Sequence, residues 1–314
     1  MKPSDGYIKY IVNLKSGASS GKYACRRFCR YLTQHGYNVR VATTTSLEHA
    51  CELSTDAAVD PGCALVVAAG GDGTVREVAH GLEGSAKPLL IVPCGTENLL
   101  ANELGFDRWL ETLVRTFEGG VTRPLDMGTV NGKCFTSIVG FGFDGDVVGM
   151  VHRRRTGHIN HFDYVYPLWR TFWGHRFEPI AVAVDGREVF DGPGMVFVGN
   201  ISRYAIGLQI LHHADFSDGL LDVCIYRCAG RIRLVKHSVL TVLKHHANCR
   251  DVIYEQGKHI TVRSPSGAIR TEMDGDPGPP LPVHIEVLPG AVQCMVPPGA
   301  KPAGIRTRIA RSFR

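Results

Sequence analysis

Three glycines and one aspartate lie together in the segment Gly70-Gly71-Asp72-Gly73-Thr74. The apolar run at 64–69 precedes them, and Thr74 and Glu77 have the spacing of a capping box that opens a helix. The apolar residues that follow fall on one helical face: Val75, Val78, Ala79 and Leu82. A strand therefore passes through the glycines into a helix, and the free backbone N–H groups at such a junction favour phosphate. A tight turn that merely requires glycine is the alternative.

The aspartate is the unexpected residue of this segment, because a carboxylate repels phosphate. A divalent cation removes the conflict, since it lets a carboxylate and a phosphate share one ion or its waters. The segment therefore predicts that Asp72 belongs to a magnesium–nucleotide site.

Two common phosphate motifs are excluded by their spacing. A dinucleotide fingerprint needs a third glycine, but Arg76 stands at that position. A P-loop needs four residues between its glycines, whereas only three separate Gly17 from Gly21, and Tyr23 replaces the magnesium-binding Ser or Thr.

The elements that must position these residues change character near residue 125. Before it, strand-like apolar runs at 7–14, 38–42, 64–69 and 88–92 alternate with helical patterns at 19–35, 46–54, 74–82, 97–104 and 108–118. Such βα units predict a parallel sheet covered by helices. After it, short alternating strands are joined by hairpin turns at Asn131-Gly132 and Asp185-Gly186, with helical inserts near 145–177 and 230–246. The second part is predicted to be mostly antiparallel β.

Composition limits the class of protein. The chain has 314 residues, enough for two domains, and its apolar runs are too short to span a bilayer. Charges at Asp5, Lys9 and Lys15 interrupt any signal-peptide core, which favours the cytoplasm. The ten cysteines form no CxxC pair, so we expect reduced core thiols rather than metal ligands. The net charge of +5 equals the charge of residues 301–314, which hold five basic and no acidic residues.

The ordered motifs resemble a known family. They are GGDGT (70–74), PCGTENLLA (93–101), LDMG (125–128), GFGFDGDV (140–147), VGN (198–200), DGLLDV (218–223) and MDGD (273–276). In this order they are similar to those of the bacterial diacylglycerol kinase-like and sphingosine kinase family of lipid kinases, over residues 8–296. GGDGT alone is shared with NAD kinases. The resemblance implies a three-layer α/β ATP-binding domain at 1–125, an antiparallel β-sandwich carrying the lipid site at 126–296, and a basic, mobile tail at 297–314.

The resemblance also assigns site residues. Nucleotide binding is carried over to Asn13, Thr44, Gly70, Gly71, Asp72, Gly73, Thr74, Gly95, Thr96, Asn98 and Asp126. Asp72 and Asp126 match acids around magnesium, and Asp218 matches a structural-metal residue, with a simple turn residue as the alternative. The family's Asn-Pro-x-Ser-Gly turn is represented by Asn13, Ser16 and Gly17, with Leu14 in place of proline. Arg76 is either a phosphate contact or an exposed helix arginine.

Two residues depart from the family pattern. Leu99 stands where many members have an aspartate near magnesium. Asp276 stands where the family usually has the glutamate that takes the proton from the lipid hydroxyl, so the general base has one methylene less. Asp276 and Asp72 are the predicted catalytic residues.

These expectations describe an ATP- and Mg²⁺-dependent lipid kinase, cytoplasmic and peripheral at the inner face of the membrane. A soluble-substrate kinase of the NAD kinase type and a non-catalytic nucleotide- or lipid-binding relative are the alternatives. The partners expected are a lipid substrate and an anionic membrane surface, with no nucleic acid and with homodimerisation left open. Contact with the membrane is assigned to the basic tail or to the insert at 150–177, whose arginines and aromatic residues fit a lipid-facing segment or a packed core.

Overall fold

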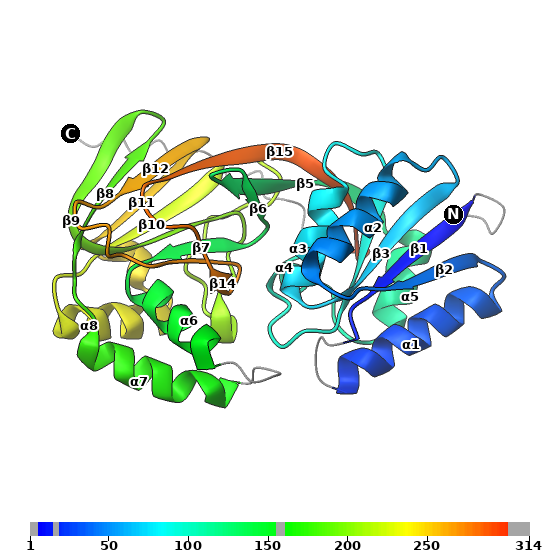
Figure 1. Cartoon of the computed structure of the whole chain (residues 1–314), viewed down its shortest axis with the longest axis horizontal. Helices are drawn as coiled ribbons and strands as arrows, with labels where there is room; N and C mark the ends of the chain where they lie inside the picture. Colours follow the sequence, from blue (N-terminus) through cyan, green and yellow to red (C-terminus); the bar gives the residue numbers. More distant parts are fainter. Residues whose placement is uncertain (1–5, 15–18, 155–160, 301–314) are drawn as a thin grey trace.

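The computed structural model describes residues 6–14, 19–154 and 161–300, which form two lobes joined by two long strands (Figure 1). The first lobe contains β1 (Tyr7–Val12), α1 (Ser19–Gln34), β2 (Asn38–Thr43), α2 (Leu47–Val59), β3 (Cys63–Gly70), α3 (Asp72–Gly81), β4 (Pro88–Pro93), α4 (Leu99–Glu103) and α5 (Leu110–Gly119).

The first lobe is a parallel sheet between two layers of helices. Its strands lie in the order β4-β3-β1-β2, and every pair is parallel. α2 packs against α3, and α1 packs against α5. β3 is apolar and almost wholly buried, as expected for a strand covered on both faces. The predicted three-layer α/β arrangement is confirmed.

The second lobe is built mainly from antiparallel strands. In chain order its elements are β5 (Val121–Val130), β6 (Lys133–Phe135), β7 (Ile138–Phe141), α6 (Phe143–Arg154), η1 (His161–Tyr164), α7 (Val165–Gly174), β8 (Pro179–Val184), β9 (Arg187–Gly199), η2 (Ala205–Gly207), β10 (Leu221–Arg227), α8 (Arg231–Val242), η3 (His246–Asn248), β11 (Val252–Gly257), β12 (His259–Arg263), β13 (Thr271–Met273), β14 (Asp276–Pro277) and β15 (Val283–Val296).

One long strand folds this second sheet onto itself. The first half of β9 pairs with β8, whereas the second half pairs with β7 and β10. The change of partner encloses an apolar core that includes Phe141, Val182, Val198, Ile260 and Ile285. The predicted antiparallel β-sandwich is confirmed.

Two strands run through both lobes (Figure 1). β15 pairs with β5 along nearly its whole length, from Ile285 opposite Val130 to Val296 opposite Val121. The pairing is irregular between Leu288 and Val292. The end of β15 also pairs in parallel with β4, so the last strand of the chain completes the sheet of the first lobe. The predicted boundary at residues 125 and 126 falls inside β5.

The predicted capping box at Thr74 and Glu77 is wrong. α3 begins two residues earlier, at Asp72, with Gly71 as N-cap and no side-chain cap hydrogen bond. Thr74 Oγ1 instead accepts a hydrogen bond of 3.0 Å from Asn13 Nδ2, and Glu77 pairs with Arg76. Partners from elsewhere in the fold therefore replace the local capping pattern.

The predicted hairpin turns are confirmed by their backbone. Asn131-Gly132 has φ of 48° and 81°, and Asp185-Gly186 has φ of 47° and 80°. The sequence analysis missed a third such turn at Asp274-Gly275, where φ is 50° and 82°. Both residues of this turn type need φ above zero, which favours Asp-Gly and Asn-Gly.

Several other expectations concern thiols, membrane spans and the chain's tail. All ten cysteines are free and most are buried, as predicted for core thiols. No helix among the described residues is both long and apolar enough to cross a bilayer. Ser16, Gly17 and the basic segment 301–314 lie outside the described residues.

Candidate active site

Three strands of the first lobe bring the predicted nucleotide residues to one edge of the sheet. The Asn13 N–H, just after β1, donates to Ala69 O of β3 at 3.0 Å. The Cys94 N–H, just after β4, donates to Gly70 O at 2.8 Å, and the buried Thr44 donates its N–H to Val12 O at 2.9 Å. Ligands of open α/β sheets bind at the carboxyl ends of the strands, which is where these residues meet.

The glycines of this edge are required by close approach. A Cβ on Gly95 would lie 2.6 Å from Gly71 Cα, and a Cβ on Gly70 would lie 2.4 Å from Thr74 Cβ. The two glycine loops therefore touch through their backbones. With Gly71 as N-cap and no side chain on the first N–H groups of α3, this surface offers backbone donors and a helix dipole to an anion.

The second loop is held by its own asparagine. Asn98 is buried with φ of 50°; its Oδ1 accepts the Gly95 N–H at 2.6 Å, and its Nδ2 donates to Gly95 O at 2.9 Å. Both ends of the amide thus shape the loop, and Thr96 at its tip is exposed. Nucleotide contacts by Asn98 and Thr96 stay a prediction.

Asp72 joins the two loops. Burial and the nearby Asp274 raise the pKa of its carboxyl to about 6, against the backbone amides of Leu99, Asn98 and Leu100, which favour the charge. Those amides open α4, so the Asp72 carboxylate sits at the N-terminus of the helix that follows the second loop. A carboxylate raised in pKa by burial and by another acid is a suitable ligand for a cation.

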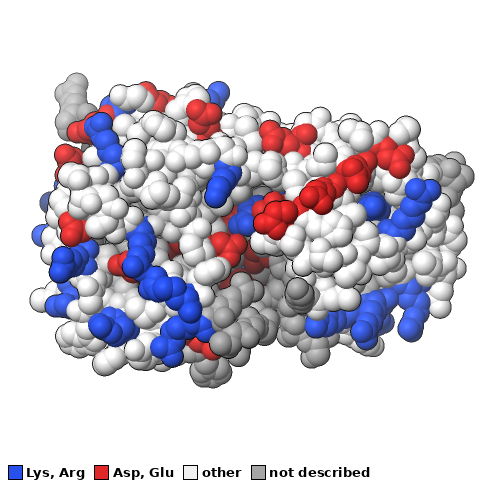
Figure 2. Space-filling view, in the orientation of Figure 1, with Lys and Arg blue, Asp and Glu red and all other residues white. Residues whose placement is uncertain are grey.

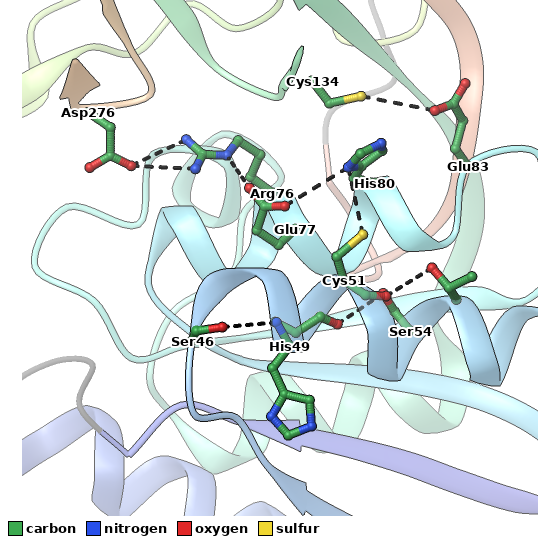
Figure 3. Close-up of polar contacts among 12 residues, drawn as sticks. Ser46, His49, Cys51, Ser54, Arg76, Glu77, His80, Glu83, Cys134 and Asp276 are labelled. Carbon is green, nitrogen blue, oxygen red and sulfur yellow. Dashed lines mark hydrogen bonds and ion pairs between the residues drawn. The ribbon is translucent and has the colours of Figure 1, made fainter. Parts of the chain in front are cut away.

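Arg76 connects the two lobes. The alternative that it is an exposed helix arginine is wrong, because only 6% of it is exposed. Its Nε donates to Glu77 Oε1 at 3.0 Å, and its Nη2 lies 3.4 Å from Asp276 Oδ2 of β14 (Figure 3). Burial opposes the charge, but Asp274, Asp276 and Glu77 outweigh it and raise the pKa of Arg76. The guanidinium of Arg76 therefore lies between Asp276, the predicted general base, and the helix that follows the first glycine loop.

The turn that carries Asp276 is anchored by the aspartate before it. Asp274 Oδ1 accepts the backbone N–H groups of Ser137 and Ile138 at 2.9 and 3.2 Å, and its Oδ2 accepts that of Thr136 at 2.9 Å. These amides lead into β7, so Asp274 fixes the hairpin of β13 and β14 against it. The side chain of Asp276 remains one-third exposed.

Two family models match this chain. The model described as diacylglycerol kinase catalytic domain matches residues 8–130. The model described as YegS C-terminal NAD kinase beta sandwich-like domain matches residues 137–296, just over half of the chain. The chain belongs to the family of diacylglycerol kinase-like lipid kinases.

Individual relatives agree with this assignment. The chain is 28% identical over 280 residues to a diacylglycerol kinase of Bacillus subtilis, covering 87% of this chain and 91% of that protein. It is 29% identical over 299 residues to a diacylglycerol kinase of Mycobacterium tuberculosis, covering 93% and 96%.

Solved structures share the fold. A diacylglycerol kinase from Bacillus anthracis superposes with a TM-score of 0.70 at 19% identity, covering 94% of this chain and 98% of that one. Yeast NADH kinase superposes with a TM-score of 0.55 at 13% identity, covering 99% and 90%.

In this lipid kinase the two remaining predicted metal residues lie where the lobes join. The buried Asp126 accepts the N–H groups of Gly290 and Gly219 at 2.6 and 2.7 Å. Asp218 lies at the surface and accepts the Leu220 N–H at 3.0 Å, and partial desolvation, with Asp215 and Asp126 nearby, raises the pKa of its carboxyl. Both carboxylates thus organise backbone, and their metal-binding roles stay a prediction.

Behind the β13–β14 turn the kinase also holds a pair of acids, the buried Glu272 and the half-buried Asp144, and no role was predicted for either. Asp144 Oδ1 accepts the Tyr204 hydroxyl, and Glu272 Oε2 accepts the Gly275 N–H at 2.9 Å. The other oxygens, Asp144 Oδ2 and Glu272 Oε1, find no further donor among the described residues, and both lie against Gly140. Burial raises the pKa of Asp144 to about 6, and burial with Asp144 as neighbour raises that of Glu272 well above its usual range. The two carboxyls also hydrogen-bond to each other, so ionisation of one opposes ionisation of the other.

Proposed function

We propose that this kinase uses ATP and Mg²⁺ to phosphorylate the hydroxyl of a membrane lipid, diacylglycerol or a related lipid such as a long-chain base. The observation that carries the proposal is the excess of carboxylates where the two lobes meet. Asp274, Asp276 and Glu77 surround one guanidinium, that of Arg76, and Asp72 lies close enough to Asp274 for the two charges to repel. An acidic site beside glycine loops that suit phosphate requires a cation between them.

The residues present fit a magnesium ion. Asp72 is the carboxylate nearest the two glycine loops and is the first candidate to hold it, directly or through water. Magnesium supplies neutralisation of the charge on the triphosphate. Asp126 is the second candidate, and its two oxygens accept the N–H groups of Gly219 and Gly290.

The chain's own residues then account for the transfer. The glycine loops hold the triphosphate through backbone N–H groups, and Arg76 lies between those loops and Asp276. Asp276 accepts the proton of the lipid hydroxyl while the hydroxyl oxygen bonds to the γ-phosphorus of ATP. The bond between the γ-phosphorus and the leaving ADP oxygen breaks. The loose 3.4 Å contact with Arg76 leaves Asp276 able to exchange this partner for the hydroxyl.

The relatives named diacylglycerol kinase and an apolar groove in the second lobe support a lipid as acceptor. The groove has a volume of about 320 Å³ between α7 and α8. Its lining is almost entirely apolar: Phe143, Leu168, Trp169, Phe172, Leu234, Val235, Ser238 and Val239. Phe143 opens α6, whose next residue is Asp144, so the groove begins one residue from the acid pair.

The exposed aromatic residues of α7 support docking on a membrane. Trp169 and Trp173 are 61% and 56% exposed, which favours the lipid-facing alternative for the 150–177 insert over the packed core. α1 and α7 both lie along the lower edge in Figure 1, and the exposed residues of α1 include Lys22, Arg26 and Arg30. Basic residues gather along this edge in Figure 2, whereas Glu48, Glu52 and Asp56 form an acidic row along α2. An anionic inner membrane face would attract the lower edge and repel the row on α2.

Transfer of label from ATP tests the proposed reaction. The protein is incubated with γ-labelled ATP, Mg²⁺ and micelles that each contain one lipid, with NAD as the soluble acceptor. We expect a labelled lipid product, and we expect Asp72→Asn to reduce it at least ~100-fold while the protein stays folded by circular dichroism, because an amide is a poor ligand for a hard cation. Label in NAD alone, or ATP binding without any transfer, would support one of the two alternatives instead.

Sedimentation with vesicles tests the docking surface. Trp169→Ala/Trp173→Ala should lose binding to vesicles of anionic lipid by about tenfold, since two exposed indoles no longer enter the interface. Trp109→Ala, at a tryptophan that is 70% exposed on the first lobe, is the matched control. A chain ending at Ala300 measures the part played by the basic tail. Equal sedimentation of the α7 variant and the control would reject the α7 surface.

A further inference from the structure

A loop of the second lobe contacts the second glycine loop and the helix that follows it. This loop, residues 200–208, comes directly after β9. The Ser202 hydroxyl donates to Glu103 of α4, whose two carboxylate oxygens lie 2.8 and 3.0 Å from it. The Ile206 N–H donates to Glu97 Oε2 at 3.2 Å, and Glu97 belongs to the second glycine loop. The 200–208 loop therefore holds the nucleotide side of the site from the opposite lobe.

The backbone of the 200–208 loop depends on these contacts. Ile206 has a φ of 58°, in the left-handed region that β-branched residues rarely occupy. Such a conformation persists only where the surrounding structure holds it. The Ile206 N–H is held by Glu97, and the Tyr204 N–H donates to Leu208 O at 2.7 Å. We therefore expect the 200–208 loop to follow the position of the second glycine loop.

The same loop reaches the β13–β14 turn through its tyrosine. The Tyr204 hydroxyl donates to Asp144 Oδ1, and the carboxyls of Asp144 and Glu272 hydrogen-bond to each other. A Cβ on Gly140 would lie 2.4 Å from Asp144 Oδ2 and 3.0 Å from Glu272 Oε1, so the glycine leaves room for the two carboxyls to meet. Glu272 Oε2 accepts the Gly275 N–H at 2.9 Å, one residue before the predicted general base.

We propose that Tyr204 is a positioning residue that links the second glycine loop to the general base. This inference rests on the proposed function, in which a nucleotide occupies the glycine loops and Asp276 accepts the proton. A nucleotide that fixes Glu97 also fixes the 200–208 loop, and the Tyr204 hydroxyl then holds the acid pair and the β13–β14 turn in the matching position. Asp276 is one-third exposed and contacts Arg76 loosely, at 3.4 Å, so the backbone of its turn determines where its carboxylate lies.

Hydrogen exchange tests this link without turnover. ADP with Mg²⁺ is the probe, because it lacks the γ-phosphate that would contact the β13–β14 turn directly. In the wild type we expect ADP to slow exchange in the second glycine loop and, by about threefold, at the Gly275 N–H, which donates to Glu272. In Tyr204→Phe the glycine loop should still be slowed, whereas the Gly275 N–H should exchange at the same rate with and without ADP.

Steady-state kinetics give a second readout. Tyr204→Phe should lower kcat by about tenfold and change KM for ATP by less than about twofold, because the glycine loops still bind the nucleotide while the base is misplaced. The variant is expected to fold, since phenylalanine keeps the ring that packs edge-on against Phe197 with 5.6 Å between ring centroids.

The chain offers a matched control in Tyr254. Its hydroxyl donates to Asp222 Oδ1 at 2.6 Å, so Tyr254→Phe removes the same kind of hydrogen bond from another half-buried tyrosine of the second lobe. This variant should match the wild type in both measurements. Equal slowing of the Gly275 N–H in Tyr204→Phe and the wild type, or slowing of the glycine loop alone in the wild type, would overturn the link and leave the nucleotide site intact. No slowing at either place would reject the nucleotide site and the link together.

Discussion

The two lobes build their sides of the active site by different physical means. The first lobe presents backbone, because its loops lie so close together that a Cβ on Gly70 or Gly95 would overlap a neighbouring atom. The second lobe presents carboxylates on a hairpin, and behind it lie Asp144 and Glu272, two acids with raised pKa values. Substitutions in the first lobe are therefore expected to disturb the site by steric overlap, whereas substitutions in the second lobe are expected to disturb its electrostatics.

The largest effect is expected on the electrostatic side. Asp276→Ala should lower kcat by the ~10²- to 10⁴-fold typical of losing a general base, with a melting temperature near that of the wild type because the side chain is partly exposed. Asp276→Glu should be tolerated, since it restores the longer arm usual in the family. Asp251→Ala removes a surface acid paired with Lys236 on the same lobe and is the control. Wild-type turnover by Asp276→Ala would place the base elsewhere.

A steric change on the other side should have the next largest effect. Gly95→Ala places a Cβ 2.6 Å from Gly71 Cα, so the two glycine loops must separate and misplace the triphosphate. We expect kcat/KM for ATP to fall about 10- to 100-fold, as for a reacting group displaced by ~1 Å. Gly119→Ala adds a Cβ with no heavy atom within 4 Å and should leave the steady-state kinetics unchanged. If both variants bind ATP equally well, contact between the loops does not shape the nucleotide site.

The smallest effect is a pH dependence of stability that follows from the buried acids. Burial raises the pKa of Asp222 to about 7 and that of Asp72 to about 6, far above their values in the unfolded chain. The folded state therefore binds more protons than the unfolded state between about pH 4 and pH 7, and stability falls as pH rises through this range. The melting temperature of the metal-free protein should be a few degrees higher at pH 5.5 than at pH 7.5.

Two further measurements show which acids cause the pH dependence of the melting temperature. Asp222→Asn should flatten the melting temperature between pH 5.5 and 7.5, because one of the raised groups no longer titrates. Mg²⁺ should stabilise the protein more at pH 7.5 than at pH 5.5 if the ionised Asp72 is its ligand. Asp60→Asn changes an acid whose pKa is lowered by the Tyr7 hydroxyl and should leave the slope over this range unchanged. A flat profile in the wild type would contradict the burial of these charges.

Local patterns predicted the elements well but could not predict their long-range partners. The alternation of strands and helices and the turns at Asn131-Gly132 and Asp185-Gly186 follow from residues close in sequence. The burial of Arg76 depends on Asp276, which lies 200 positions away, so the helix alone indicated an exposed arginine. Thr74 does not cap the helix for the same reason, because its hydroxyl oxygen accepts a hydrogen bond from Asn13, which follows another strand.

In the site, too, features made by residues close in sequence were predicted, whereas contacts between residues far apart in sequence were not. The glycine loops were predicted because their motif is continuous. Asp274 lies within a motif that was noticed, yet its role in fixing β7 needed the structure, because its amide partners lie at residues 136 to 138. The cysteines were judged by their spacing along the chain, which cannot reveal that Cys51 and Cys134 share His80 as a neighbour.

The last strand sets the order in which this protein can fold as it is synthesised. β15 ends at Val296, yet it pairs with β4 and so extends a parallel sheet whose first four strands, β1 to β4, all come from the first 93 residues. Most multidomain chains fold their first domain while the ribosome is still making the next one. Here the first lobe leaves the ribosome while one edge of β4 is unpaired. That edge can pair with strands of other chains until nearly 300 residues have been made and β15 covers it.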